Sequence, residues 1–509
     1  MFTDVENEVI AVAPAPQPVQ HSNTSHHAMF RAIAWTGAAK WAVQLLTWTS
    51  TIVVARILVP SDYGLFGLAT LYLGLVGLIS EFGLGQAVVT FREMSREHVR
   101  QLNTLSVIFG IALFGVSCAV AGPLGQFFRA PKLPTLVVVM SLSFLISGAQ
   151  VVPDALLQRD LRFKLLASFD TSRVVIQALS TIILARLGFS YWSLALGNLV
   201  GVVVGCALLT IASPCAFALP RLQQLRKALS FSTDVLGSRI AWYLYSNSDF
   251  MVAGRRLGQA ALGAYTVAWT IASTPVEKVT TLVTRVTPAF FSAVQHEEAQ
   301  LRRYLLRITE GLALITFPAS FGMALVADQF VLCVLGPKWN TAIMPLRLLA
   351  IYAALRSITT VFPSVLTARR DSRFVMWNTF AAAAIFPAAF YFASRWGTTG
   401  IATTWILIYP LITVPFMWRT FTNIDLPPRT YFKSLIPALR GCFVMTSMVV
   451  VARLTMPPAL PGVIRLAISV IAGAAAYGII LTISDRPLLR ELYAALRNPV
   501  ADSNGSPIA

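Results

Sequence analysis

Charged and hydrogen-bonding side chains interrupt several stretches of the chain that are otherwise apolar. Within each stretch they recur every three or four residues, so each set falls on one face of a helix. The sets are Thr36, Lys40, Gln44, Thr47 and Thr51; Asp170, Arg173, Gln177 and Thr181; and Arg239, Trp242, Ser246 and Asp249, with Glu277, Lys278 and Arg356 on two further stretches. Arginine offers a planar fork to phosphate and lysine offers a point charge, so these cations suit an anionic ligand.

The elements that carry these side chains are long enough to cross a lipid bilayer. The chain is 56% hydrophobic and 12% charged, and its mean hydropathy is +0.68. Uncharged runs such as residues 102–122, 134–152, 374–394 and 398–418 match the roughly 20 residues that a spanning helix needs. The runs are continuous and do not alternate as the strands of a β-barrel would, so spanning helices are the simpler solution. We therefore expect an all-α polytopic membrane protein with about 14 transmembrane helices.

The net charge of +18 does not indicate a nucleic-acid-binding protein, because the basic residues lie in small clusters between the apolar runs. If the helices alternate in direction and the amino terminus is cytoplasmic, about 21 basic residues fall on one side of the membrane and about 9 on the other. The richer side is expected to face the cytoplasm. This bias predicts a multi-pass inner-membrane protein with both termini in the cytoplasm.

An internal repeat divides the chain into two halves. Residues Arg56, Leu58, Gly64, Phe66 and Ala69 recur as Arg255, Leu257, Gly263, Tyr265 and Ala268, an offset of about 200 residues. The segment VPDALLQRDLRF at 152–163 is echoed by FPSVLTARRDSRF at 362–374. Six helices separate equivalent points, so the halves should share one orientation and form a V-shaped bundle around a central cleft.

The predicted organisation has five parts. These are a disordered cytoplasmic tail at 1–30, six-helix halves at 31–213 and 214–420, two further helices at 421–484, and a cytoplasmic tail at 485–509. The five cysteines have no metal-ligand spacing, and we expect neither a metal nor a cofactor.

Six segments together resemble the polysaccharide transporters of the MOP superfamily, the Wzx-type flippases related to the lipid II flippase MurJ and to MATE exporters. The segments are ARILVPSDYGLF (55–66), EFGLGQAVV (81–89), PDALLQRDLRF (153–163), SNSDFMVAGRRLGQAALGAY (246–265), PAFFSAVQHEEAQLRRYL (288–305) and LGPKWNTAIMPLRLLAIYAALR (335–356). The resemblance covers almost the whole chain. It implies a flippase that moves an undecaprenyl-pyrophosphate-linked oligosaccharide repeat unit across the inner membrane for surface polysaccharide synthesis, by alternating access and coupled to an ion gradient.

The resemblance gives the polar residues within the spans candidate roles. Charges at membrane depth cost about 2.5–3.5 kcal/mol each at a helix centre, so such residues are functional candidates. Substrate-binding candidates in the cavity are Lys40, Gln44, Arg173, Gln177, Arg239, Lys278 and Arg356, and ion-coupling candidates are Asp249 and Glu277. The alternative is that some of these cations lie at the interface or pair with carboxylates such as Asp170 and Glu277.

Four arginines at the expected cytoplasmic mouth, namely Arg159, Arg162, Arg369 and Arg373, are candidates for a gate that attracts the anionic head group. Anchoring to anionic lipid is an equally good interpretation of the same charges. Expected partners are the lipid-linked oligosaccharide and membrane lipids, with the polysaccharide polymerase and chain-length machinery as candidates, and no nucleic acid.

Two other functions compete with this prediction. A MATE-like exporter of small cations would favour a cavity rich in carboxylates, contrary to the cations present. A membrane polymerase or glycosyltransferase would need a sizeable external loop with catalytic groups, and the predicted loops are short and lack paired carboxylates. The sequence therefore favours a transporter and not an enzyme.

Overall fold

The computed structural model describes residues 43–80, 85, 88–89, 94–220, 239–457 and 459–484. Lys40 and the two predicted tails, 1–30 and 485–509, lie outside these ranges. The helices are Val43–Ile57, α2 (Pro60–Ser80), α4 (Arg96–Phe127), α5 (Leu133–Arg159), α6 (Phe163–Arg186), α7 (Trp192–Ala212), residues 239–246, α9 (Ser248–Arg256), α10 (Gln259–Ala293), α11 (Glu298–Phe330), α12 (Ile343–Thr359), α13 (Phe362–Ala368), α14 (Ser372–Ala393), α15 (Gly397–Asn423), α16 (Pro428–Thr455) and α17 (Gly462–Ser484). Short helical turns η1 (Val331–Leu335), η2 (Pro337–Ala342) and η3 (Ser394–Trp396) connect some of them.

The described residues form helices and loops and contain no strand, which confirms the predicted all-α fold. Nine described segments are long and apolar enough to cross a membrane by length and composition, and one of them, Ser372–Asn423, holds both α14 and α15. With the remaining long helices this arrangement agrees with about 14 transmembrane helices. An all-helical bundle satisfies every backbone group within its own segment, as a bilayer requires.

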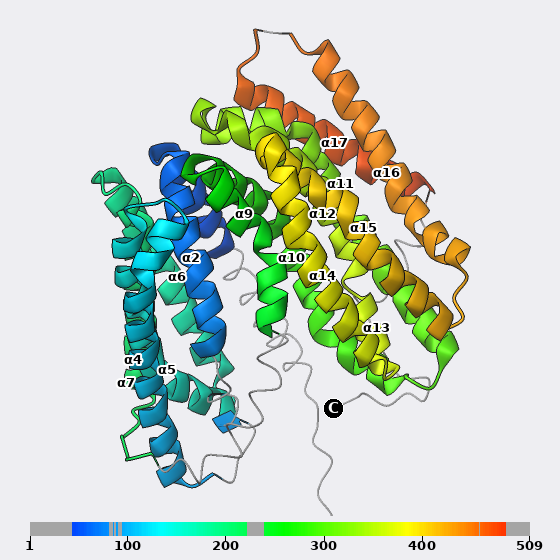
Figure 1. Cartoon of the computed structure of the whole chain (residues 1–509). Helices are drawn as coiled ribbons and strands as arrows, with labels where there is room; N and C mark the ends of the chain where they lie inside the picture. The colour runs from blue at the N-terminus through cyan, green and yellow to red at the C-terminus, as the bar shows by residue number, and fades with distance from the viewer. Residues whose placement is uncertain are drawn as a thin grey trace, which may run out of the picture.

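Two groups of helices make up the molecule (Figure 1). Helices α2 and α4–α7 form one group, helices α10–α17 form the other, and α9 lies between them. Helices α16 and α17 lie on the outside of the second group. They are attached to it by polar contacts, because Asp328 of α11 forms ion pairs with Arg347 and with Arg453 of α16, and the Tyr477 hydroxyl donates to the Leu314 carbonyl at 2.8 Å.

Helices α2 and α10 cross at the residues that the repeat singled out, Gly64 and Gly263. A Cβ atom on Gly64 would lie 1.8 Å from the Gln259 carbonyl oxygen, and one on Gly263 would lie 1.7 Å from the Pro60 carbonyl oxygen. Each glycine therefore lets the backbone of the other half approach. The repeated glycines thus reflect a reciprocal helix crossing between the two groups.

Two helical segments are interrupted. Asn247 separates the helical residues 239–246 from α9. Thr360 and Val361 separate α12 from α13. Both breaks lie next to the polar residues described below.

Candidate functional site

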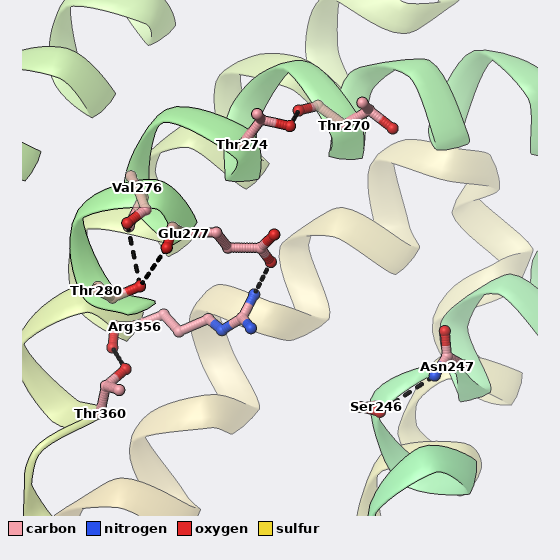
Figure 2. Close-up of polar contacts among 9 residues, drawn as sticks. All are labelled: Ser246, Asn247, Thr270, Thr274, Val276, Glu277, Thr280, Arg356 and Thr360. Atoms are coloured by element: carbon pink, nitrogen blue, oxygen red, sulfur yellow. Dashed lines mark hydrogen bonds and ion pairs between the residues drawn. The ribbon is translucent and has the colours of Figure 1, made fainter. Parts of the chain in front are cut away.

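Helix α10 brings a carboxylate into the bundle by bending. Pro275 lies inside the helix and cannot donate a backbone hydrogen bond, so the helix is expected to bend there. Figure 2 shows the ribbon changing direction between Thr274 and Glu277. Threonine hydroxyls also bond back to the helix on either side, with Thr274 donating to the Thr270 carbonyl at 2.6 Å and Thr280 donating to the Val276 carbonyl at 3.1 Å.

Glu277 of α10 forms an ion pair with Arg356 of α12. The Arg356 Nη1 atom lies 3.1 Å from the Glu277 Oε1 atom, and Figure 2 shows the two side chains pointing toward each other. The side chains are 47% exposed for Glu277 and 34% exposed for Arg356, so both remain accessible while paired. The sequence assigned Arg356 to the substrate and Glu277 to an ion, and the structure brings the two residues into one site.

The pair is surrounded by groups that can accept or donate hydrogen bonds. The Arg356 carbonyl accepts from the Thr360 hydroxyl at 2.8 Å, and the Thr359 hydroxyl is 2.8 Å from the Tyr409 hydroxyl. Ser246 and Asn247, where the helical residues 239–246 end, lie on a separate ribbon in the same view (Figure 2). The Tyr243 carbonyl accepts hydrogen bonds from both the backbone amide and the side-chain amide of Asn247, each at 3.0 Å.

Asp249 is fully buried. Its Oδ2 atom accepts hydrogen bonds from the Tyr265 hydroxyl at 2.7 Å and from the Trp405 indole at 3.0 Å, and its Oδ1 atom accepts one from the Phe250 amide at 2.9 Å. The residue therefore joins α9, α10 and α15. Aromatic rings pack around these donors. The ring centroid of Trp269 lies 5.6 Å from the ring centroids of both Phe250 and Trp405. Ion exchange at this carboxylate would require the aromatic residues to move, and the ion-coupling role of Asp249 stays a prediction.

The polar stripe of α6 packs against a glycine stripe on α7. A Cβ atom on Gly205 would lie 3.1 Å from the Arg173 Cδ atom, one on Gly201 would lie 2.9 Å from the Gln177 Cβ atom, and one on Gly197 would lie 2.0 Å from the Thr181 hydroxyl. The stems of Arg173 and Gln177 thus lie along the α6–α7 contact. Their role in binding substrate stays a prediction.

The remaining described candidates are Gln44, Arg239 and Lys278. Gln44 is half-buried on the helix Val43–Ile57, Arg239 is exposed at the start of the helical residues 239–246, and Lys278 is exposed beside Glu277. Adjacent residues project from different sides of a helix, which separates Lys278 from the pair.

The four arginines predicted to lie at a cytoplasmic mouth differ in their contacts. Arg369 forms an ion pair with Glu298 at 3.0 Å and donates to the Gln295 carbonyl at 3.1 Å, and neighbouring Asp371 forms an ion pair with Arg419 at 2.7 Å. Among the residues that the structure describes, Arg159, Arg162 and Arg373 have no ion pair. The arginines of the two echoed segments therefore do not make equivalent contacts.

Sequence reasoning offered pairing of a cation with Glu277 as an alternative but did not identify Arg356 as the partner. It did not find the enclosure of Asp249 by Tyr265 and Trp405. The sequence did contain one signal: Tyr265 belongs to the repeated segment and Asp249 to the motif SNSDFMVAG. In the described part of the chain, no group of three or more His, Cys, Asp or Glu side chains could hold a metal ion.

The fold matches solved structures of membrane transporters. The lipid II flippase MurJ, in an inward closed conformation, superposes with a TM-score of 0.68 at 14% identity, covering 90% of this chain and 100% of that one. A multidrug resistance MATE family transporter of the MOP superfamily, in an inward-facing conformation, superposes with a TM-score of 0.60 at 15% identity, covering 75% and 94%. The chain is a multi-pass helical membrane protein with this fold.

A family model described as "Polysaccharide biosynthesis protein" matches residues 53–344, and the chain belongs to that family. The lipopolysaccharide biosynthesis protein WzxC of Escherichia coli is 27% identical over 75% of this chain and 78% of its own length. The succinoglycan biosynthesis transport protein ExoT of Rhizobium meliloti is 26% identical over 94% and 97%. A probable low-salt glycan biosynthesis flippase, Agl15 of Haloferax volcanii, is 23% identical over 60% and 65%.

Proposed function

We propose that this protein is a flippase that moves a lipid-linked oligosaccharide across the inner membrane for the synthesis of a surface polysaccharide. Membership of the polysaccharide biosynthesis family and the names of the relatives support the saccharide, and the fold shared with a lipid II flippase supports a lipid-linked substrate. The observation that carries the proposal is the accessible Glu277–Arg356 pair within an apolar bundle. Ionisable residues within membrane-spanning segments are rare and commonly mark the path of a substrate or an ion.

The geometry of the pair suggests how an anionic substrate binds. A single contact of 3.1 Å, from one Arg356 nitrogen to one Glu277 oxygen, holds the guanidinium group. A pyrophosphate offers several acceptor oxygens to the arginine fork and competes with Glu277 for it. The released Glu277 carboxylate then takes up a proton or a monovalent cation, because an unpaired charge at this depth is costly. Exchange of partners at Arg356 would thereby couple substrate movement to an ion gradient.

The proposed movement is a rocking of two halves, 31–213 and 214–420, with 421–484 carried along by the second half. The ion pairs of Asp328 with Arg347 and Arg453 support this grouping, since they attach α16 to α11 and α12. The excess of basic residues supports an orientation with residues 96 and 370 on the cytoplasmic side.

Reporter fusions test this orientation. A periplasm-active reporter fused after Ser190 or Asn340 should be active, and one fused after Arg96 or Arg370 should be inactive, because the basic loops are retained in the cytoplasm. Alkaline phosphatase activity, with a cytoplasm-active reporter at the same four sites as control, measures the outcome. The opposite pattern at all four positions would invert the proposed direction of transport.

Deleting the gene tests the function itself. Surface polysaccharide should fall to background while lipid-linked repeat units accumulate on the cytoplasmic leaflet, because synthesis of the unit continues without its export. Polymer immunoblots and extraction of lipid-linked sugars measure both effects, and a plasmid copy should restore polymer. Wild-type polymer in a deletion strain that has no other flippase would contradict the proposal.

A further inference from the structure

Two segments that are far apart in sequence exchange hydrogen bonds where the helix groups meet. Helix Val43–Ile57 of the first half ends beside η1 and η2 of the second half. The Arg56 guanidinium donates from Nε to the Val334 carbonyl at 2.6 Å and from Nη2 to the Cys333 carbonyl. These carbonyls end a helical turn just before Gly336, whose φ of +100° stops the helix.

The second half returns the same kind of contact. Lys338 donates from Nζ to the Arg56 carbonyl at 2.6 Å and to the Ile57 carbonyl at 3.1 Å, and the Trp339 indole donates to the Ala55 carbonyl at 2.9 Å. The acceptors lie in the last turn of the first helix, where carbonyls lack partners within the helix and carry the negative end of its dipole. Each half therefore caps a helix carboxyl terminus of the other half with a cation.

Trp339 supplies the buried part of this contact. Its side chain is fully buried, and its ring packs edge-on against Tyr63 of α2 with 5.3 Å between the centroids. Arg56 and Lys338 are exposed, so water competes for their hydrogen bonds. The buried indole donor is shielded from that competition.

The equivalent residues on the other side of the repeat make different contacts. Arg255 answers to Arg56, and Lys132 follows a proline as Lys338 does. Arg255 of the second half lies over the ring of Phe127 of the first half, 5.3 Å from the ring centroid. Lys132 lies over the ring of Tyr191 of its own half, 5.6 Å from the ring centroid. In this conformation the reciprocal capping is formed at one of the two related positions.

We propose that Arg56, Lys338 and Trp339 form a clasp that holds the two halves together at this end and sets how often the end opens. The clasp must break whenever the halves separate there, because its donors and acceptors belong to different halves. In the proposed orientation Asn340, and with it this end of the molecule, faces the periplasm. That orientation rests on the proposed function, whereas the clasp does not. Lys132, whose contact with Tyr191 stays within the first half, provides a control within the same chain.

Hydrogen–deuterium exchange of the full chain in lipid nanodiscs tests the clasp. In the Arg56→Ala/Lys338→Ala double variant, the amides of residues 55–63 and 333–342 should exchange at least about 10-fold faster than in the wild type. The Trp339→Phe variant keeps an aromatic ring but removes the indole donor, and it should give a smaller increase in the same peptides. Arg56→Lys should retain part of the protection. The control variant Lys132→Ala, which removes a contact within the first half only, should change these peptides by less than about 2-fold.

Two results would overturn the clasp. One is unchanged exchange in both segments of a double variant that is as abundant and as thermally stable as the wild type. The other is an equal increase in the control variant, which would indicate general loosening. A loss of transport is not part of the readout, so failure of the clasp and failure of the flippase proposal are distinguishable.

Discussion

Replacing Arg356 by alanine is expected to lower flipping by about 10- to 100-fold without loss of protein, because a hydrogen bond to a charged group contributes about 1.5–3 kcal/mol and 1.4 kcal/mol corresponds to tenfold. Arg356→Lys should retain part of the activity, since it keeps the charge but loses the planar fork. Polymer level at matched expression in a deletion strain measures the effect.

The partner of Arg356 should behave differently. Glu277→Gln keeps the size of the side chain and can still accept a hydrogen bond from Arg356, but it cannot exchange a proton or compete as an anion. Flipping by this variant should persist and lose its dependence on the ion gradient. Lys278→Ala, on the exposed neighbour of Glu277, is the control for ion coupling and should leave the dependence on the ion gradient unchanged. Wild-type activity of Arg356→Ala would show that the pair only joins α10 to α12.

Replacing Gly263 by alanine should destabilise the folded protein by about 1–3 kcal/mol, toward the upper end, because the new methyl group meets backbone that cannot rotate away. The Cβ atom would lie 1.7 Å from the Pro60 carbonyl oxygen and 2.8 Å from the Gly64 amide nitrogen. Gly64→Ala should have a similar effect through the Gln259 carbonyl. Thermal unfolding in detergent, followed by intrinsic fluorescence, measures the loss.

Gly77 offers a control on α2, the helix that carries Gly64. A Cβ atom there meets no atom within 4 Å, and alanine is the better helix former by about 1 kcal/mol, so Gly77→Ala should be neutral or stabilising. If Gly263→Ala and Gly77→Ala unfold at the same temperature, the close crossing of α2 and α10 is not required for stability.

The sequence by itself determined the fold class and the periodicity of the polar residues. Apolar runs of bilayer length leave the backbone little choice except a helix, so the spans followed from length and composition. The repeat of Gly64 at Gly263 predicted two related halves, and it did so because both glycines meet the same steric need. It did not indicate that the two glycines meet each other.

Only the tertiary structure decided which polar groups belong to one site. Glu277 and Arg356 are 79 residues apart and meet because α10 bends at Pro275 and packs beside α12. The structure encloses Asp249, the predicted ion-coupling residue, between Tyr265 and Trp405, and it packs Arg173 and Gln177 along α7. In a bilayer a helix can be apolar on every side, so composition does not reveal which face meets a neighbour. Periodicity therefore gives the face of a helix that carries polar residues, and packing between helices decides what that face contacts.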